Sequence, residues 1–355
     1  MAFSVGGRNA IGLDIGSTAV RVAQLSGSRE AYVLKTFGQS ALPQGAVVDG
    51  EIRDPGAVSE AIAQLWKRAK LSQKHAVLGL ANQRVVVRLV DFPYLDENEF
   101  RESLRFQAAE YIPMPVDEAQ LDFMVMDDFT TANNEHMMRV LLVAAAIDTV
   151  ETFVGAVGAA GIQPDGVDLI PFAVARAVSR AARGEMGVEG SEAIVDVGGG
   201  VTNVIIHVNG EPRFVRILLI GGDDATTALA EGLGVEFDEA EAVKLDLGRD
   251  VGPEAAKRIL DRQVAALVEE IRGSLDYYLS QDDSEPITSI IVTGGGSLTS
   301  GFVGRLEQTL RTPVIKGTPL AELAAVKAGL TEDQIRQVEP VAAAAVGLAI
   351  GAIEK

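Results

Sequence analysis

The sequence predicts an α/β protein made of two similar halves, because two segments far apart in the chain follow the same order. Each is an apolar strand that ends in an aspartate and is followed by glycines and a hydroxyl residue, at 11–18 and 194–202. The aspartates, Asp14 and Asp196, are separated by about half of the 355-residue chain, the spacing that an internal duplication would produce. Because a single hydrophobic core usually stops growing below this length, two domains are expected.

Both segments have the residues of a phosphate-binding turn. Glycine lets the backbone turn with a positive φ and brings its N–H groups against phosphate oxygens. Aspartate supplies a carboxylate for hydrated Mg²⁺, which usually reaches proteins through one or two carboxylates together with substrate phosphates. One glycine turn alone is more often a plain tight turn. Two such turns, with a third strand-glycine run at 289–297, favour a nucleotide-binding cleft between the halves.

Hydrophobic periodicity predicts the elements of both halves in chain order. In the first half it predicts strands at 11–14, 20–25 and 32–37 and a helix from Pro55 to 70. The second half repeats the pattern with strands at 194–197, 201–208 and 214–219 and a helix from 221 to 231. A long helix at 254–280 and an Ala- and Gly-rich helix at 341–353 complete it.

Residues from about 85 to 160 belong to neither repeat and are interpreted as an insertion. The predicted elements are a strand at 84–90, a helix at 96–110, strands near 121–126 and 137–145, and a helix at 149–159. These five elements predict a small βαββα unit.

Composition excludes several classes of function. The net charge of −19 and the pI near 4.6 argue against nucleic-acid or anionic-lipid binding, because phosphate surfaces favour clustered Lys and Arg. The absence of cysteine excludes disulfides and thiolate chemistry, and the three histidines lack metal-ligand spacing. The N-terminal residues do not resemble a signal peptide, and the most apolar stretch, 341–353, is too short to span a bilayer. A cytoplasmic protein is expected.

The order of the three motifs resembles the actin-like ATPase superfamily, which includes actin, sugar kinases, DnaK-type chaperones and FtsA. The resemblance implies a duplicated, ribonuclease-H-like two-domain fold with ATP and Mg²⁺ between the domains. It implies a first domain at 1–84 and 161–190, an inserted subdomain at 85–160, a second core at 191–220 and 285–355, and a helical adenine-side subdomain at 221–284.

The same resemblance implies the residues of the nucleotide site. Asp14 and Asp196 would face Mg²⁺ through water. The phosphates would lie between a first group, Gly16, Ser17 and Thr18, and a second group, Gly198, Gly199, Gly200 and Thr202. Glu241 and Lys244, on one helix face, would hold ribose and adenine, which Gly294 and Gly295 would flank. The other expected nucleotide-binding residues are Gly221, Gly222, Gly296 and Ser297.

The insertion distinguishes among relatives, because FtsA and the PilM family of type IV pilus assembly proteins carry a subdomain here. The run 106–123, in which a helix ends in Tyr-Ile-Pro before an acidic turn and a Leu-Asp-Phe strand, resembles the PilM pattern. In that family a groove between insertion and first domain binds the cytoplasmic tail of the membrane protein PilN. We therefore predict a partner groove that includes Phe106, Tyr111 and Ile112, or, as the alternative, that these residues seal the insertion onto the first domain.

The resemblance also implies the protein's setting. FtsA ends in a membrane-binding amphipathic helix, whereas this sequence stops at 352–355 after the last predicted helix, so we expect no direct membrane anchor. Recruitment to the inner face of the membrane would occur through the PilN-type partner. Other pilus platform proteins and a homo-oligomer or ring are further expected partners.

The sequence also bears on whether the protein hydrolyses ATP. Chaperones of this superfamily place a carboxylate at the start of a connecting helix, where this chain has Ile170, and the nearest carboxylate is Asp168. Since an aliphatic side chain cannot deprotonate water, ATP is expected to be mainly a structural ligand with at most slow hydrolysis. The alternatives are an FtsA- or MreB-like filament protein and, less favoured, a small-molecule kinase.

Overall fold

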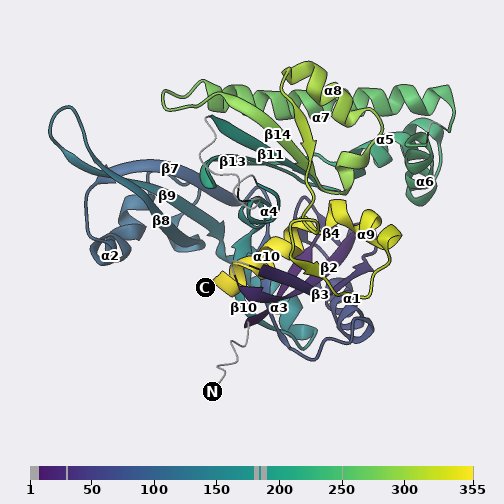
Figure 1. Cartoon of the computed structure of the whole chain (residues 1–355), viewed down its shortest axis with the longest axis horizontal. Coiled ribbons are helices and arrows are strands. Elements are labelled where there is room, and N and C mark those ends of the chain that lie inside the picture. Colours follow the sequence, from purple (N-terminus) through teal and green to yellow (C-terminus); the bar gives the residue numbers. More distant parts are fainter. Residues whose placement is uncertain (1–7, 29–30, 180–183, 185–189, 250, 355) are drawn as a thin grey trace.

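The computed structural model describes residues 8–28, 31–179, 184, 190–249 and 251–354. The prediction that the chain has no signal peptide rests on N-terminal residues that lie mostly outside these ranges. Residues 180–183 and 185–189 of the predicted first domain also lie outside them. The chain forms two sheet-based halves, stacked one above the other in Figure 1, with a third unit projecting to one side.

The first half is built on a six-stranded sheet in the order β10-β6-β1-β2-β3-β16. Strands β1 (Arg8–Ile15), β2 (Ala19–Ser28) and β3 (Ala31–Ala41) are antiparallel, and β6 (His75–Leu80) runs parallel to β1. Helices α1 (Pro55–Arg68) and α3 (Ile147–Ala159) pack together over one face, and α10 (Ala343–Glu354) covers the other. The remaining strands are β10 (Gln163–Leu169) and β16 (Ala325–Val326), with the short pair β4 (Val47–Val48) and β5 (Glu51–Ile52) alongside.

The second half repeats this connectivity, as the duplication predicted. Strands β11 (Ser191–Val197), β12 (Thr202–Val208) and β13 (Glu211–Leu218) are antiparallel, and β14 (Ile287–Thr293) is parallel to β11. The sheet order is β13-β12-β11-β14-β15, with β15 at Val314–Lys316. Helices α5 (Gly222–Leu233), α7 (Glu254–Leu279) and α8 (Phe302–Leu310) share its core, and α6 (Phe237–Leu247) packs on α5.

The predicted long helix is confirmed as α7, which has one buried face. The predicted Ala- and Gly-rich helix is confirmed as α10, which packs closely against α4 and the first sheet. It lies with α4 (Ile170–Val178) in a cluster that also contains Ile194 and Ile291 of the second sheet, so the two helices are packed between the two sheets. The buried stripe of α7 consists of Ile259, Val264, Leu267, Val268, Ile271, Leu275 and Tyr278.

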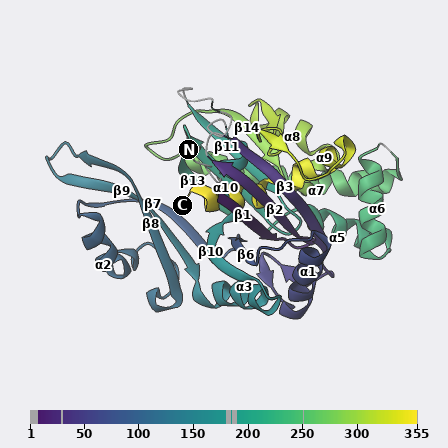
Figure 2. The same ribbon diagram turned by 60° about the horizontal axis from the view of Figure 1, so that its bottom comes forward.

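The projecting unit is a three-stranded antiparallel sheet in the order β7-β9-β8 with one helix on it (Figure 2). It consists of β7 (Val85–Pro93), α2 (Glu97–Ala108), a 3₁₀ turn (Val116–Glu118), β8 (Ala119–Thr130) and β9 (His136–Ala146). Its own core gathers around Phe92, Phe100 and Phe123.

Two segments of the chain pack against a different unit from the one to which the predicted domain division assigned them. Helix α3 was expected to complete the βαββα unit, but its Phe153 and Val157 lie in the core of the first half beside α1. Within the predicted second core, 285–355, strand β16 pairs with β3, and α10 covers the first sheet because it is apolar around most of its surface. The other boundaries stay predictions.

The remaining described elements are short: a 3₁₀ turn at Gly295–Leu298, helix α9 (Glu332–Val338) and a 3₁₀ turn at Glu339–Val341. In the described part of the chain no single helix is long and apolar enough to cross a bilayer. One pair bent by 80°, Glu332–Val341 with Ala343–Glu354, meets the length and composition criteria together.

Candidate functional site

A cavity of about 270 Å³ lies between the halves, and both predicted phosphate turns line it. The first turn connects β1 to β2 and the second connects β11 to β12, so each sits at the same place in its half. The predicted residues that line the cavity are Asp14, Gly16, Ser17, Thr18, Asp196, Gly198, Gly199, Gly200, Gly222, Glu241, Lys244, Gly294, Gly295 and Gly296.

The two turns also match in detail. In the first, the Gly16 N–H donates to the carbonyl of Ala19 at 3.1 Å, and in the second, the Gly198 N–H donates to the carbonyl of Val201 at 2.9 Å. Each aspartate faces a polar residue across its hairpin: Asp14 is in register with Arg21, and Asp196 with Asn203. The duplication therefore extends from the strand order to the polar pairs at the cleft.

Asp196 is buried and the side chain of Asp14 is only 13% exposed, and this removal from water changes the acidity of both. Burial raises the pKa of Asp196 to about 6, although the Asn203 amide, which donates to it at 3.0 Å, opposes the shift and the negative charge of Asp14 adds to it. Burial also raises the pKa of Asp14, while the Arg21 guanidinium 3.5 Å away opposes the rise. Two neighbouring buried carboxylates form a site in which a cation would be stabilised.

Two buried polar atoms without hydrogen-bond partners, next to these carboxylates, bear on whether a magnesium nucleotide fits this cavity. Within the described residues, Arg21 Nε and Asn203 Oδ1 are buried without a hydrogen-bond partner, and both residues line the cavity. Such orphans are costly unless a ligand or water satisfies them. No group of three or more acidic or histidine side chains in the described ranges could hold a metal alone. Two carboxylates, a guanidinium and open glycine turns suit an ion that phosphates also coordinate.

Glu241 and Lys244 are paired on α6, as their spacing predicted, with Nζ 2.6 Å from the carboxylate. The Lys244 ammonium also donates to the carbonyl of Gly222 at 2.9 Å and to the Thr226 hydroxyl at 2.7 Å. The Thr226 hydroxyl in turn donates to Glu241 at 2.5 Å. This network fixes α6 against the start of α5 and leaves the Glu241 carboxylate, which is more exposed than Lys244, at the cavity wall.

The third glycine run forms a flat wall because side chains cannot fit there. Gly294 has a φ of 85°, and a Cβ on it would lie 2.2 Å from the Val197 carbonyl oxygen. Three apolar residues that the motifs did not identify, Leu245, Leu298 and Val341, line the same cavity. The arrangement can accept a flat ring between bare backbone and apolar side chains.

Three predicted residues do not line the cavity. The Thr202 hydroxyl donates to the carbonyl of Ile220 at 2.7 Å, and the Ser297 hydroxyl to that of Gly294 at 2.7 Å, so both stabilise the backbone behind the wall. Gly221 lies against the second turn, where a Cβ would be 2.1 Å from the Gly199 carbonyl oxygen. The pattern of residue types could not separate these supporting positions from lining ones.

Sequence reasoning missed Arg21, Asn203 and Asp223, all of which line the cavity. Arg21 and Asn203 each follow an aspartate by seven positions, so a comparison of the two hairpins could have identified them. Asp223 follows Gly221-Gly222 and carries no repeated signal.

Ile170 lines the cleft at the start of α4, at the place where a catalytic carboxylate was considered. Asp168, the nearest carboxylate in sequence, forms an ion pair with Arg176 and lines a different cavity. The described geometry therefore keeps Asp168 away from the phosphate turns.

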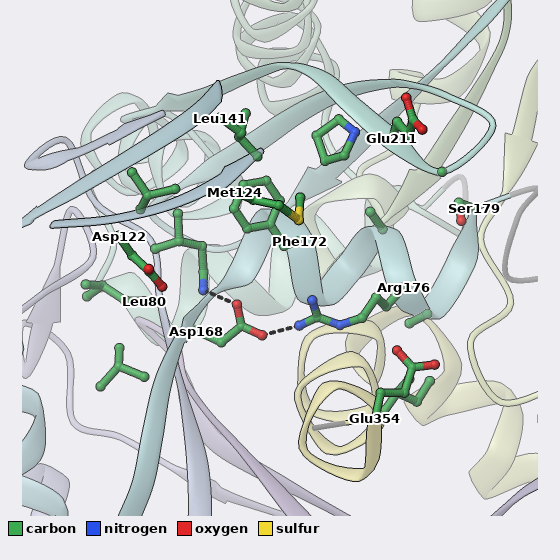
Figure 3. A pocket seen from close by; sticks show the side chains of 18 of the residues that line it. Leu80, Asp122, Met124, Leu141, Asp168, Phe172, Arg176, Ser179, Glu211 and Glu354 are labelled. Carbon is green, nitrogen blue, oxygen red and sulfur yellow. Dashed lines mark hydrogen bonds and ion pairs between the residues drawn. The ribbon is translucent and has the colours of Figure 1, made fainter. Parts of the chain in front are cut away.

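That second cavity is a groove of about 1220 Å³ between the projecting unit, the first half and the β12–β13 turn. Figure 3 shows Met124 and Leu141 from the projecting sheet on one side, and Phe172 and Arg176 from α4 opposite. Carboxylates outnumber guanidinium groups along it: Asp122, Asp168, Glu211, Glu322 and Glu354 against Arg101 and Arg176.

The residues predicted for a partner groove do not line this cavity. Phe106 is 85% exposed on α2. The ring of Tyr111 packs edge-on against that of Phe92, with the ring centroids 5.3 Å apart. Ile112 is buried in the core of the projecting unit. Tyr111 and Ile112 thus stabilise that unit internally and do not seal it onto the first half.

Comparison with known families matches residues 12–353 to the family described as type IV pilus assembly protein PilM. A solved PilM-PilN type IV pilus biogenesis complex is similar over 98% of this chain and 99% of that chain, with 27% identity and a TM-score of 0.84. Cell division protein FtsA of Pseudomonas aeruginosa is 26% identical over 400 residues, which cover 100% of this chain and 92% of FtsA. MreB 5 of Spiroplasma citri bound to AMPPNP shares the fold over 87% of this chain and 91% of that chain, at 14% identity and a TM-score of 0.50. The predicted actin-like fold is confirmed.

Proposed function

The chain belongs to the PilM family of type IV pilus assembly proteins, and on this premise we propose that it is a nucleotide-binding platform protein of the pilus machinery. Its 1220 Å³ groove binds the cytoplasmic tail of a PilN-type membrane protein, which recruits it to the inner face of the membrane. The observation that carries the proposal is the match, over nearly the whole of both chains, to a PilM-PilN complex. Further platform proteins and further copies of this chain are additional partners in the same proposal.

The groove has the properties that an extended peptide needs. Phe172, Leu141 and Met124 supply apolar contacts, and the surrounding carboxylates favour a peptide that carries positive charge. Strand β8 is at the edge of its sheet, so its backbone is available for pairing with an added strand. A short cytoplasmic tail with apolar side chains and a basic group or free amine is the ligand that fits this chemistry.

The smaller cavity between the halves is the proposed site for ATP with Mg²⁺. Asp14 and Asp196 would hold the hydrated ion, the two glycine turns would hold the phosphates, and Glu241 with the Gly294 wall would hold the nucleoside. Bound magnesium would neutralise part of the phosphate charge. Ile170 offers no group that can orient or deprotonate water, so the nucleotide serves mainly to hold the two halves together. A saturating ligand stabilises the bound form by roughly a few kcal/mol through mass action.

Neighbouring side chains on β8 provide the test of the peptide site. Met124 is 50% exposed and lines the groove, whereas Val125 is 40% exposed and does not line it. Titration calorimetry with a synthetic peptide that carries the cytoplasmic tail of a PilN-type protein should show at least a tenfold loss of affinity for Met124→Arg and wild-type affinity for Val125→Arg. Wild-type affinity for Met124→Arg would refute the assignment of the groove.

Deletion of the projecting unit gives an independent test. Val85 is in register with Ala145, so the ends of the unit lie side by side and a short Gly-Ser linker can replace 85–146 while α3 stays in its core. The shortened protein should keep nucleotide binding and lose the peptide. Undiminished peptide binding would place the partner elsewhere on the first or second half.

A further inference from the structure

One side-chain contact crosses the cleft at the phosphate turns. The Ser17 hydroxyl of the first turn donates a 2.7 Å hydrogen bond to the carboxylate of Asp223 in α5 of the second half. The two residues are 206 positions apart, and both line the cavity between the halves. A carboxylate thus occupies the point where the halves approach each other.

The second glycine turn meets the same point. A Cβ on Gly199 would lie 2.2 Å from Ser17 Oγ and 2.7 and 2.9 Å from the two Asp223 carboxylate oxygens. Ser17, Gly199 and Asp223 therefore enclose one small space. A phosphate held by both turns has to share that space with the carboxylate.

Apart from the Ser17 hydroxyl, the neighbouring donors of the protein form their hydrogen bonds with groups other than Asp223. The first two amides of α5 are not free to bind an anion, because the Gly222 N–H donates to the Gly198 carbonyl and the Asp223 N–H donates to the Gly199 carbonyl. The ammonium of Lys244 uses its three donors on Gly222, Thr226 and Glu241. The negative charge of Asp223 consequently acts on whatever anion enters between the turns.

We propose that Asp223 acts against the terminal phosphate of the bound nucleotide: its carboxylate, positioned by Ser17 against Gly199, weakens the binding of a nucleoside triphosphate relative to that of the diphosphate. The inference rests on the proposed binding of adenine nucleotides in this cleft. Like charges in a partly desolvated site repel strongly, so loss of the carboxylate should favour the more highly charged ligand most.

The experiment compares ATP, ADP and adenosine in the presence of Mg²⁺ by titration calorimetry. Asp223→Asn removes the charge but keeps an oxygen that can accept from Ser17, and Asp223→Ala removes both. Asp224→Asn is the matched control, because Asp224 is the next residue of α5 but its carboxylate accepts from the Gly221 N–H at 2.7 Å and does not line the cavity. Both Asp223 variants should shift the ratio of ATP to ADP affinity toward ATP by about tenfold, with adenosine affinity and the Asp224 variant unchanged.

The outcomes separate this inference from the function on which it rests. If the wild-type protein takes up no adenine nucleotide, the nucleotide part of the proposed function fails and the inference fails with it. If nucleotides bind but the ratio stays within twofold of wild type, or moves toward ADP, only the role of Asp223 is refuted. Circular dichroism verifies folding, and Asp223→Asn decides the question if Asp223→Ala does not fold.

Discussion

The contact between α10 and α4 leads to a sharp prediction about a single methyl group. A Cβ on Gly347 would lie 1.7 Å from the carbonyl oxygen of Ala173 and 2.3 Å from its carbonyl carbon. The first distance is roughly 1.5 to 2 Å shorter than an ordinary van der Waals contact. Since both obstacles are backbone atoms of a helix, no side-chain rotation can relieve the clash, and Gly347→Ala must push the two helices apart.

The magnitude follows from two opposing effects. Replacing glycine by alanine inside a helix gains up to about 1 kcal/mol. Overpacking a close contact costs typically 1–3 kcal/mol and sometimes more, and here the separation also loosens Ala173 and Val174, which are fully buried between the sheets. We expect Gly347→Ala to lower the free energy of unfolding by about 2 kcal/mol, the upper overpacking cost less the gain in helix propensity.

Urea unfolding can measure this change in the intact protein. Trp66 is the single tryptophan, is buried in the first half and reports unfolding by its fluorescence. Gly155→Ala on α3 is the matched control, because a Cβ there meets nothing within 4 Å, and it should gain about 0.5–1 kcal/mol. A Gly347→Ala protein that unfolds at or above the wild-type urea midpoint would show that the close helix contact is absent in solution.

Three further changes should separate the roles of other residues. Because the pKa of Asp196 rises from 3.8 to about 6 on folding, the stability that protonated Asp196 contributes is fully present below pH 3.8 and is lost as the pH rises through 6. In urea unfolding without Mg²⁺ or nucleotide, Asp196→Asn should therefore be more stable than wild type by roughly 3 kcal/mol at pH 7.5, and equal stability at that pH would contradict the buried charge. Ile170→Glu should raise ATP turnover at least tenfold over Ile170→Leu, as measured by phosphate release, and equal rates would show that residue 170 does not face the reacting phosphate. Phe106→Ala should change thermal stability within about 0.5 kcal/mol whereas Ile112→Ala should cost about 2–4 kcal/mol, and the reverse order would mean that Phe106, not Ile112, belongs to the core.

The paired turns could be predicted because their signals are local. A buried strand, an aspartate and glycines occur within eight or nine residues, and any fold that uses them must place their backbone at the same strand end. The register that sets Arg21 opposite Asp14 and Asn203 opposite Asp196 was also present in the spacing, but only a comparison of the hairpins would reveal it. Asp223 could not be found this way, because its importance depends on Ser17, which reaches it from the other half.

The residues that line the groove could not be predicted, for a different reason. Its walls come from β8 and β9, from α4, from the turn before Glu211 and from the end of α10, and no local pattern indicates that these segments meet. The PilM-like sequence at 106–123 predicted that Tyr111 and Ile112 belong to the partner groove. However, an apolar pair at the end of a helix can belong to an internal core as well as to a binding surface. The burial of Ile112 beside Phe92 decides for the core.

The helices that connect the two cavities give a structural ligand a physical role. Ile170 at the start of α4 and Ala343 and Ala344 at the start of α10 line the nucleotide cleft, whereas Arg176 and Glu354 near their ends line the groove. Both helices are buried between the sheets and touch at Gly347, so neither can shift alone. Under the proposed function, a nucleotide that fixes the separation of the halves also fixes one wall of the groove, and by linkage the peptide would then alter nucleotide affinity by the same factor. This reciprocity requires binding alone, which agrees with a cleft in which an isoleucine stands in place of a catalytic carboxylate.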